Sequence, residues 1–206
     1  MTACPQDVIK NYLFAFFANA WALLCLFGFV LWQLLAVYTL LYSPKQVLEA
    51  LFLWQQFPGF LFVELVFLIV PLSLFLLKEL LVLPQVLNKK IFLFPTLQNL
   101  LLPLVAAFWG AHLFYWGQAV QQGLMGHQVY QMVLALHANV FLMSAYWVGF
   151  AALIAYLYLL GRSFFTEHAF VSRWDQGSLL RNLWLGGNAL LFGLGVIAFV
   201  NQWSVL

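Results

Sequence analysis

Three ionisable side chains interrupt long apolar stretches of the sequence and are the first candidates for chemistry. Glu64 is the only charged residue between Ala50 and Leu77, and His112 and His137 lie in the stretch 91–161, which has no charged residue. An ionisable group within a membrane-spanning helix costs about 3 kcal/mol on insertion scales, so it requires a partner or a function. These three side chains therefore point to cofactor, proton or metal chemistry.

The two histidines are of the type and spacing that a haem b requires. A six-coordinate haem iron takes one imidazole from each side, and the porphyrin needs an apolar slot between helices. His112 and His137 fall on neighbouring apolar segments, and aromatic side chains lie one helical turn from them: Trp109 and Trp116 beside His112, and Phe141 beside His137. We therefore expect these five residues to bind a haem b, with the two imidazoles as its ligands.

The same side chains admit other interpretations. Hydrogen bonds between helices would explain His112 and His137 without any cofactor. Two imidazoles and the Glu64 carboxylate form a ligand set that copper, iron or zinc can use, so a metal site is another candidate. A quinone site is also possible, with Glu64 handling a proton and His127, in the glycine-rich turn 117–128, near the quinone headgroup.

The composition places these residues in a membrane. Of the 206 residues, 66% are apolar and only 7% are charged, and the mean hydropathy is +0.97. A soluble domain carries about 25% charged residues, so the chain is predicted to be an integral membrane protein. The net charge of +2 does not suggest a nucleic-acid partner, and Cys4 and Cys25 cannot form a CxxC motif.

A membrane-crossing helix needs about 20 apolar residues, and the charge-free stretches provide five such segments. We expect an all-α bundle that forms one transmembrane domain over residues 1–206. Its helices are predicted near 13–42, 58–83, 93–119, 128–160 and 180–203.

Depths along these helices follow from a rise of about 1.5 Å per residue. On that scale Glu64 lies about 9 Å, His112 about 10 Å and His137 about 14 Å below the outer ends of their helices. The three ionisable groups are therefore expected to share the outer half of the membrane.

Two further features predict local helix geometry. Pro71 predicts a kink in the second helix, because proline lacks the backbone N–H that continues the hydrogen-bond ladder. Gly186, Ala189 and Gly193 place small residues on one side of the last helix, which favours close packing against another helix there.

The basic residues predict the orientation. Five crossings put seven of them on the side of the N-terminus and only Lys45 on the other side. Basic residues accumulate on the cytoplasmic side, so the N-terminus is expected in the cytoplasm and the C-terminus in the periplasm of a bacterial inner membrane. The seven are Lys10, Lys78, Lys89, Lys90, Arg162, Arg173 and Arg181.

The layout resembles that of the cytochrome b membrane subunit of fumarate reductases and succinate:quinone oxidoreductases. That family has five spans with the N-terminus inside, and places haem histidines in contexts similar to residues 109–115 (WGAHLFY) and 134–139 (LALHAN). It also carries histidines on its first two spans, where this sequence has Trp32 and Pro71. The resemblance therefore implies either one haem bound in a rearranged way, or a quinone site alone with Glu64 as its acidic residue.

Together these features predict a membrane-anchor subunit of a respiratory oxidoreductase that binds haem b, quinone or both. Its expected partners are membrane lipid, quinone and soluble redox subunits, which would dock on the basic residues Lys89, Lys90, Arg162, Arg173 and Arg181. The alternative is a non-redox membrane subunit, either a permease component of a transporter or a scaffold of a larger membrane complex.

Overall fold

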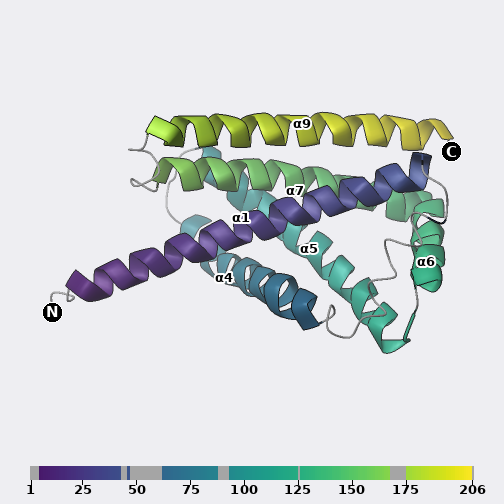
Figure 1. The fold of residues 1–206 in the computed structure, drawn as a ribbon, viewed down its shortest axis with the longest axis horizontal. Coiled ribbons are helices and arrows are strands. Elements are labelled where there is room, and N and C mark those ends of the chain that lie inside the picture. Colours follow the sequence, from purple (N-terminus) through teal and green to yellow (C-terminus); the bar gives the residue numbers. More distant parts are fainter. Residues whose placement is uncertain are drawn as a thin grey trace.

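The computed structural model of the chain describes residues 5–42, 46, 62–87, 93–124, 126–167 and 175–205, and every element within them is a helix (Figure 1). The all-α prediction is therefore confirmed. In chain order the elements are α1 (Pro5–Tyr42), the π-helical turn η2 (Leu65–Ile69), α4 (Val70–Leu87), α5 (Leu93–Gln121), α6 (Gly126–Ala138), α7 (Val140–Glu167) and α9 (Asp175–Val205).

Four helices in the described part of the chain are long and apolar enough to cross a membrane, which is compatible with a multi-pass membrane protein. Their candidate spans are Phe16–Leu35, Leu97–Gln121, Val140–Phe165 and Arg181–Asn201. The second helix predicted from the sequence, near 58–83, corresponds to η2 and α4, and its residues 58–61 lie outside the described ranges. The π turn η2 precedes α4 within this helix, and α4 carries the charged residues Lys78 and Glu79.

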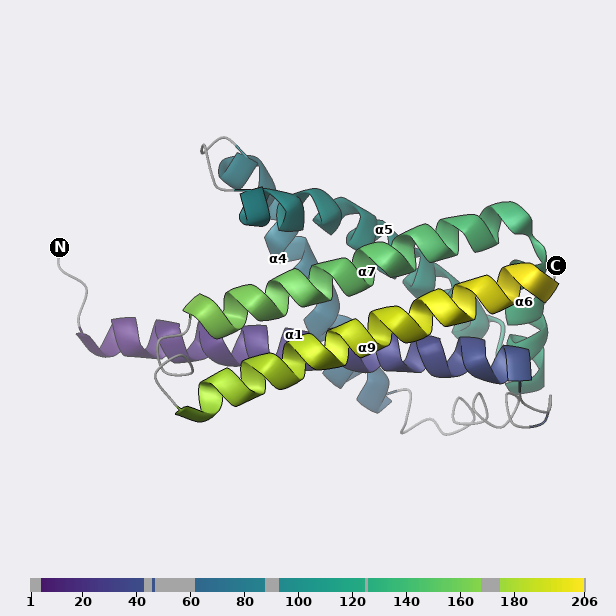
Figure 2. The same ribbon diagram turned by 90° about the horizontal axis from the view of Figure 1, so that it is seen from above.

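Helix α7 runs along the bundle in the direction opposite to α1 and α9, whereas α4 and α5 cross it obliquely (Figures 1 and 2). Helices α7 and α9 are antiparallel, since the rings of Trp147 and Phe199 lie 5.5 Å apart near one end and Gly161 meets Trp184 near the other. Helices α1 and α9 run in the same direction, and the hydroxyl group of Tyr38 donates a hydrogen bond to a backbone carbonyl of α9.

The second helix contains a π turn shortly before Pro71. The backbone N–H of Val70 donates to the carbonyl of Leu65, five residues earlier, so the turn holds one more residue than an α-helical turn. This turn widens the helix immediately before Pro71, and the kink at Pro71 remains a prediction.

Proline also leaves a carbonyl group without its usual donor. Pro71 has no N–H to offer to the carbonyl of Phe67, four residues earlier. Two side chains of α1 donate to this carbonyl instead: the indole N–H of Trp21 at 3.0 Å and the thiol of Cys25 at 3.5 Å. The missing backbone bond in the second helix is thus replaced by bonds that attach it to the first.

The segment 128–160 is not the single helix that the sequence predicts. It consists of the end of α6 and most of α7, with the non-helical Asn139 between them. The Asn139 side-chain oxygen accepts hydrogen bonds from the backbone N–H groups of Phe141 and Leu142, both at 3.1 Å. This is a helix N-cap, and such a cap favours a new helix start. As a result α6 runs across the end of the bundle, transverse to α7 (Figures 1 and 2).

Candidate functional site

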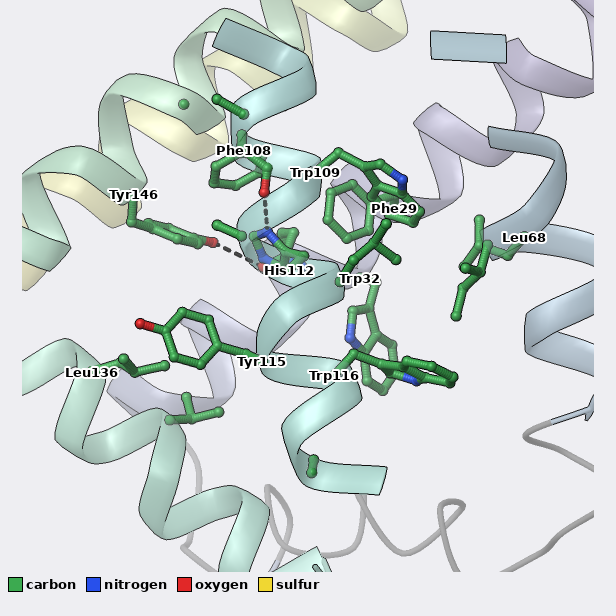
Figure 3. Close-up of a pocket in the computed structure, with 18 of the residues that line it drawn as sticks. Phe29, Trp32, Leu68, Phe108, Trp109, His112, Tyr115, Trp116, Leu136 and Tyr146 are labelled. Atoms are coloured by element: carbon green, nitrogen blue, oxygen red, sulfur yellow. Dashed lines mark hydrogen bonds between the residues drawn. The ribbon is translucent and has the colours of Figure 1, made fainter. Parts of the chain in front are cut away.

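A cavity of about 1140 Å³ lies among α1, the η2–α4 helix, α5, α6 and α7. Helices α5 and α7 diverge towards the end at which α6 lies (Figure 1), and large aromatic side chains of α1 and α5 line the space between them (Figure 3). The structure brings five residues predicted to have a functional role to this cavity: Glu64, Trp109, His112, Trp116 and His137.

His112 is held in a defined orientation by its own helix. Its Nδ1 lies 2.9 Å from the carbonyl oxygen of Phe108 (Figure 3). Since a carbonyl group only accepts hydrogen bonds, Nδ1 is the donor, and the lone pair of the neutral ring is on Nε2. The ring of Phe29 packs edge-on against the imidazole, with centroids 5.0 Å apart. His112 can therefore offer Nε2 to a ligand.

Glu64 is tied to the same helix. The indole N–H of Trp116 donates to its carboxylate oxygen Oε2 at 3.0 Å, and about two turns earlier the indole of Trp109 donates to the hydroxyl of Ser73 at 3.0 Å. Trp116 lies four residues after His112, on the same face of α5. The carboxyl group is thus placed about one helical turn from the imidazole.

His137 lies in the last turn of α6, and not deep within a membrane-crossing helix. The expected depth of 14 Å required a continuous helix over 128–160, which the break at Asn139 removes. Burial lowers the pKa of the His137 imidazole below its usual value, which favours the neutral ring. The Tyr146 ring packs against both histidines, 5.5 Å from His137 and 6.4 Å from His112 between centroids.

Tyr146 and Gln33 are cavity residues that the sequence analysis did not identify. The Tyr146 hydroxyl group donates to the Gln33 side-chain oxygen at 3.1 Å, linking α7 to α1. Gln33 is only 8% exposed and is one of two buried polar side chains among the described residues. The available signal for it was that Gln33 and Asn19 are the two amide side chains of the apolar segment 13–42.

Two predicted site residues do not line the cavity. Phe141 is 79% exposed. A continuous helix would place it one turn after His137 on the same face, but the helix breaks at Asn139 between the two residues. His127 is exposed near the start of α6. The cavity-facing side chains of α6 include Val129, Met132 and Leu136.

The donor atom through which an imidazole holds a haem iron is present at the cavity as His112 Nε2. In the described part of the chain no group of three or more His, Cys, Asp or Glu side chains is positioned to hold a metal ion. His137 opens onto the same cavity as His112. Any group held between the two imidazoles would also meet the ring of Tyr146.

Of the basic residues predicted to dock a partner, Arg162 and Arg181 are exposed near the end of α7 and the beginning of α9. Lys89, Lys90 and Arg173 lie outside the described residues. Lys78 is exposed and pairs with Glu79 at 3.6 Å.

No protein-family model matches the chain, and no match was found among curated proteins or solved structures.

Proposed function

We propose that this chain is a membrane-anchor subunit of a respiratory oxidoreductase and that its cavity binds a quinone. The observation that carries the proposal is that His112 and Glu64, each held by a hydrogen bond, both line a mostly apolar and aromatic cavity. Ligand sites of this kind combine an apolar lining with a few oriented polar groups.

The chemistry of a quinone matches this lining. Its flat ring packs between aromatic side chains, and its two oxygens exchange protons when the ring is reduced or oxidised. The reduced ring carries hydroxyl groups, and His112 Nε2 and the Glu64 carboxylate are hydrogen-bond acceptors of the cavity lining that can receive their protons. The cavity volume of about 1140 Å³ exceeds what the ring needs and leaves room for an apolar tail.

The proposed topology is five crossings, with the N-terminus in the cytoplasm of a bacterial cell and η2–α4 as the second crossing. The direction of α7, opposite to that of α1 and α9, supports it, as does the distribution of basic residues, seven against one. In this topology α6 lies at the periplasmic surface, and Arg162 and Arg181 face the cytoplasm, where a soluble redox subunit would dock. Reporter fusions at residues 42, 90, 124 and 170 test the arrangement, and an outward-facing reporter at 90 or 170 would contradict it.

Quinone binding can be measured by quenching of tryptophan fluorescence, because Trp32, Trp109 and Trp116 all line the cavity. We expect saturable quenching of the purified protein by a short-chain 1,4-benzoquinone. Glu64→Gln should weaken binding about tenfold, which corresponds to about 1.4 kcal/mol. Glu79→Gln is the matched control, since Glu79 lies on the same helix but outside the cavity. Quenching that does not saturate, or that both variants change equally, would refute the quinone site.

Haem b is a second candidate occupant, and the bond from His112 Nδ1 to the Phe108 carbonyl supports it. Metal-bound histidines commonly donate their other ring nitrogen to a carbonyl or carboxylate group in this way. A bound haem would supply one-electron transfer, with His112 and His137 as the residues that hold it.

An absorbance spectrum of the purified protein tests the haem. The dithionite-reduced minus oxidised spectrum should show a b-type band, and His112→Ala and His137→Ala should each abolish it. A band that survives His137→Ala would remove His137 from the ligand set, and the absence of any band would refute the haem and leave the quinone site standing. If the purified protein binds neither quinone nor haem and copurifies with other membrane subunits, the non-redox scaffold is favoured.

A further inference from the structure

The cavity has a second polar link, on the opposite side from Glu64 and Trp116. There the hydroxyl group of Tyr146 on α7 donates to the side-chain oxygen of Gln33 on α1 at 3.1 Å. Both residues line the cavity (Figure 3 shows Tyr146 with its hydrogen bond). The bond from Trp116 to Glu64 joins α5 to the second helix. The bond from Tyr146 to Gln33 joins α7 to α1, between residues 113 positions apart in the sequence.

Gln33 is an unusual residue for its surroundings. Its neighbours Val30, Leu34 and Val37 belong to the buried apolar core, and a carboxamide removed from water without hydrogen bonds is strongly destabilising. The bond from Tyr146 occupies its oxygen only. The side-chain nitrogen carries two further N–H donors, and it belongs to a residue that faces the cavity.

The two sides of the cavity therefore differ in hydrogen-bonding character. On the α5 side, His112 presents the lone pair of Nε2, because its Nδ1 proton is used by the Phe108 carbonyl. On the α1 side, Gln33 presents amide N–H donors, because its oxygen is used by Tyr146. His112 and Gln33 both line the cavity, so one ring-sized ligand in it can face both groups.

We propose that Gln33 is a specificity-determining residue that donates a hydrogen bond to the second oxygen of the ring ligand, and that Tyr146 is the positioning residue that orients the Gln33 carboxamide. The inference deepens the proposed quinone site and depends on it. It restricts the ligand to a ring with an oxygen at each end: a hydroxyl group of the reduced ring donates to His112 Nε2, and the other oxygen accepts from Gln33. A site built to hydrogen-bond a polar group rejects an analogue that lacks the group.

The test compares two probes in calorimetric titrations of the purified full chain. One is the short-chain 1,4-hydroquinone, and the other is the matching phenol, which keeps a single hydroxyl group. The wild-type protein should bind the hydroquinone about tenfold more tightly than the phenol. Gln33→Met, which keeps the length of the side chain and removes its donors, should weaken hydroquinone binding about tenfold and leave phenol binding unchanged. Tyr146→Phe keeps the ring that contacts both histidines and should weaken hydroquinone binding by a smaller factor, about threefold.

Gln118→Met on α5 is the matched control, because Gln118 does not line the cavity, and its hydroquinone affinity should equal that of the wild type. A Gln33→Met protein that loses affinity for both probes equally would show that Gln33 only supports the fold, and would overturn the inference while leaving the quinone site intact. A Gln33→Met protein that still prefers the hydroquinone tenfold would also overturn it. A wild-type protein that binds neither probe would instead refute the quinone site, and the inference with it.

Discussion

The contact between α7 and α9 and the cavity beside α7 show two different ways in which helices of this protein associate. Against α9, Gly161 lies so close to the indole of Trp184 that a Cβ atom at this position would overlap it. Further along the same contact, a Cβ atom at Gly195 would meet the side chain of Phe150 at 3.5 Å. The absence of glycine side chains allows this close approach, as is common between membrane helices.

The cavity side of the bundle combines a glycine contact with polar bonds between helices. The bond to Glu64 joins α5 to the second helix, and the bond to Gln33 joins α7 to α1. A Cβ atom at Gly149 of α7 would overlap the side chain of Phe108 of α5. Because apolar burial does not drive helices together within lipid, close packing and hydrogen bonds are the available sources of stability. The contact between α7 and α9 therefore depends on glycine, whereas the cavity side of α7 adds hydrogen bonds between helices to its glycine contact.

Filling the glycine contact is expected to have the largest effect. Gly161→Leu places a branched side chain where the Trp184 indole lies, and overpacking of this kind costs about 3 kcal/mol at its upper range. We expect a marked fall in the thermal unfolding midpoint in detergent, followed by circular dichroism. Gly186→Leu on α9 is the control, since Gly186 is exposed and a Cβ atom there meets nothing within 4 Å. Equal losses in the two variants would mean that the α7–α9 contact has no special role.

A smaller effect is expected at the cavity end of the second helix, where Trp21 of α1 donates to the Phe67 carbonyl. Trp21→Phe should cost about 1 kcal/mol, because the carbonyl then keeps only the weaker thiol donor. Pro71→Ala restores the backbone N–H that the Phe67 carbonyl lacks. In that background Trp21→Phe should therefore cost less than half as much, which a double-mutant cycle of unfolding free energies measures. Full additivity would show that the indole contributes through packing alone.

The composition and charge-free stretches were sufficient to predict helices and much of their extent. The segment predicted near 93–119 is α5 at Leu93–Gln121, and the one near 180–203 lies within α9 at Asp175–Val205. These predictions depend on the lengths of apolar segments and on the positions of charged residues, and both can be read directly from a sequence. The number of crossings and their orientation remain predictions.

The features that the sequence did not reveal depend on contacts between distant residues. The small-residue side of the last helix was predicted to pack closely, but Gly186, Ala189 and Gly193 are exposed, so this prediction is wrong. Sequence shows which side of a helix is small, and not which side meets a neighbour. In the same way, the pairing of Gln33 with Tyr146 joins residues on two helices whose mutual placement only the folded bundle defines.

The smallest effect is expected for a change at Asn139, the break between α6 and α7 that places α6 beside the cavity. Asn139→Ala removes the side-chain oxygen that accepts the N–H groups of Phe141 and Leu142, and loss of an N-cap costs about 1 kcal/mol. Without the cap, α6 can continue into α7, which would carry the α6 side chains Met132 and Leu136 away from the cavity. We therefore expect a modest loss of stability together with weaker quinone quenching. Asn139→Asp keeps a capping oxygen and should retain the wild-type affinity. An Asn139→Ala protein with unchanged quinone affinity would show that the transverse position of α6 is held by its apolar contacts with α5 and α1, so that the break itself contributes little to the cavity.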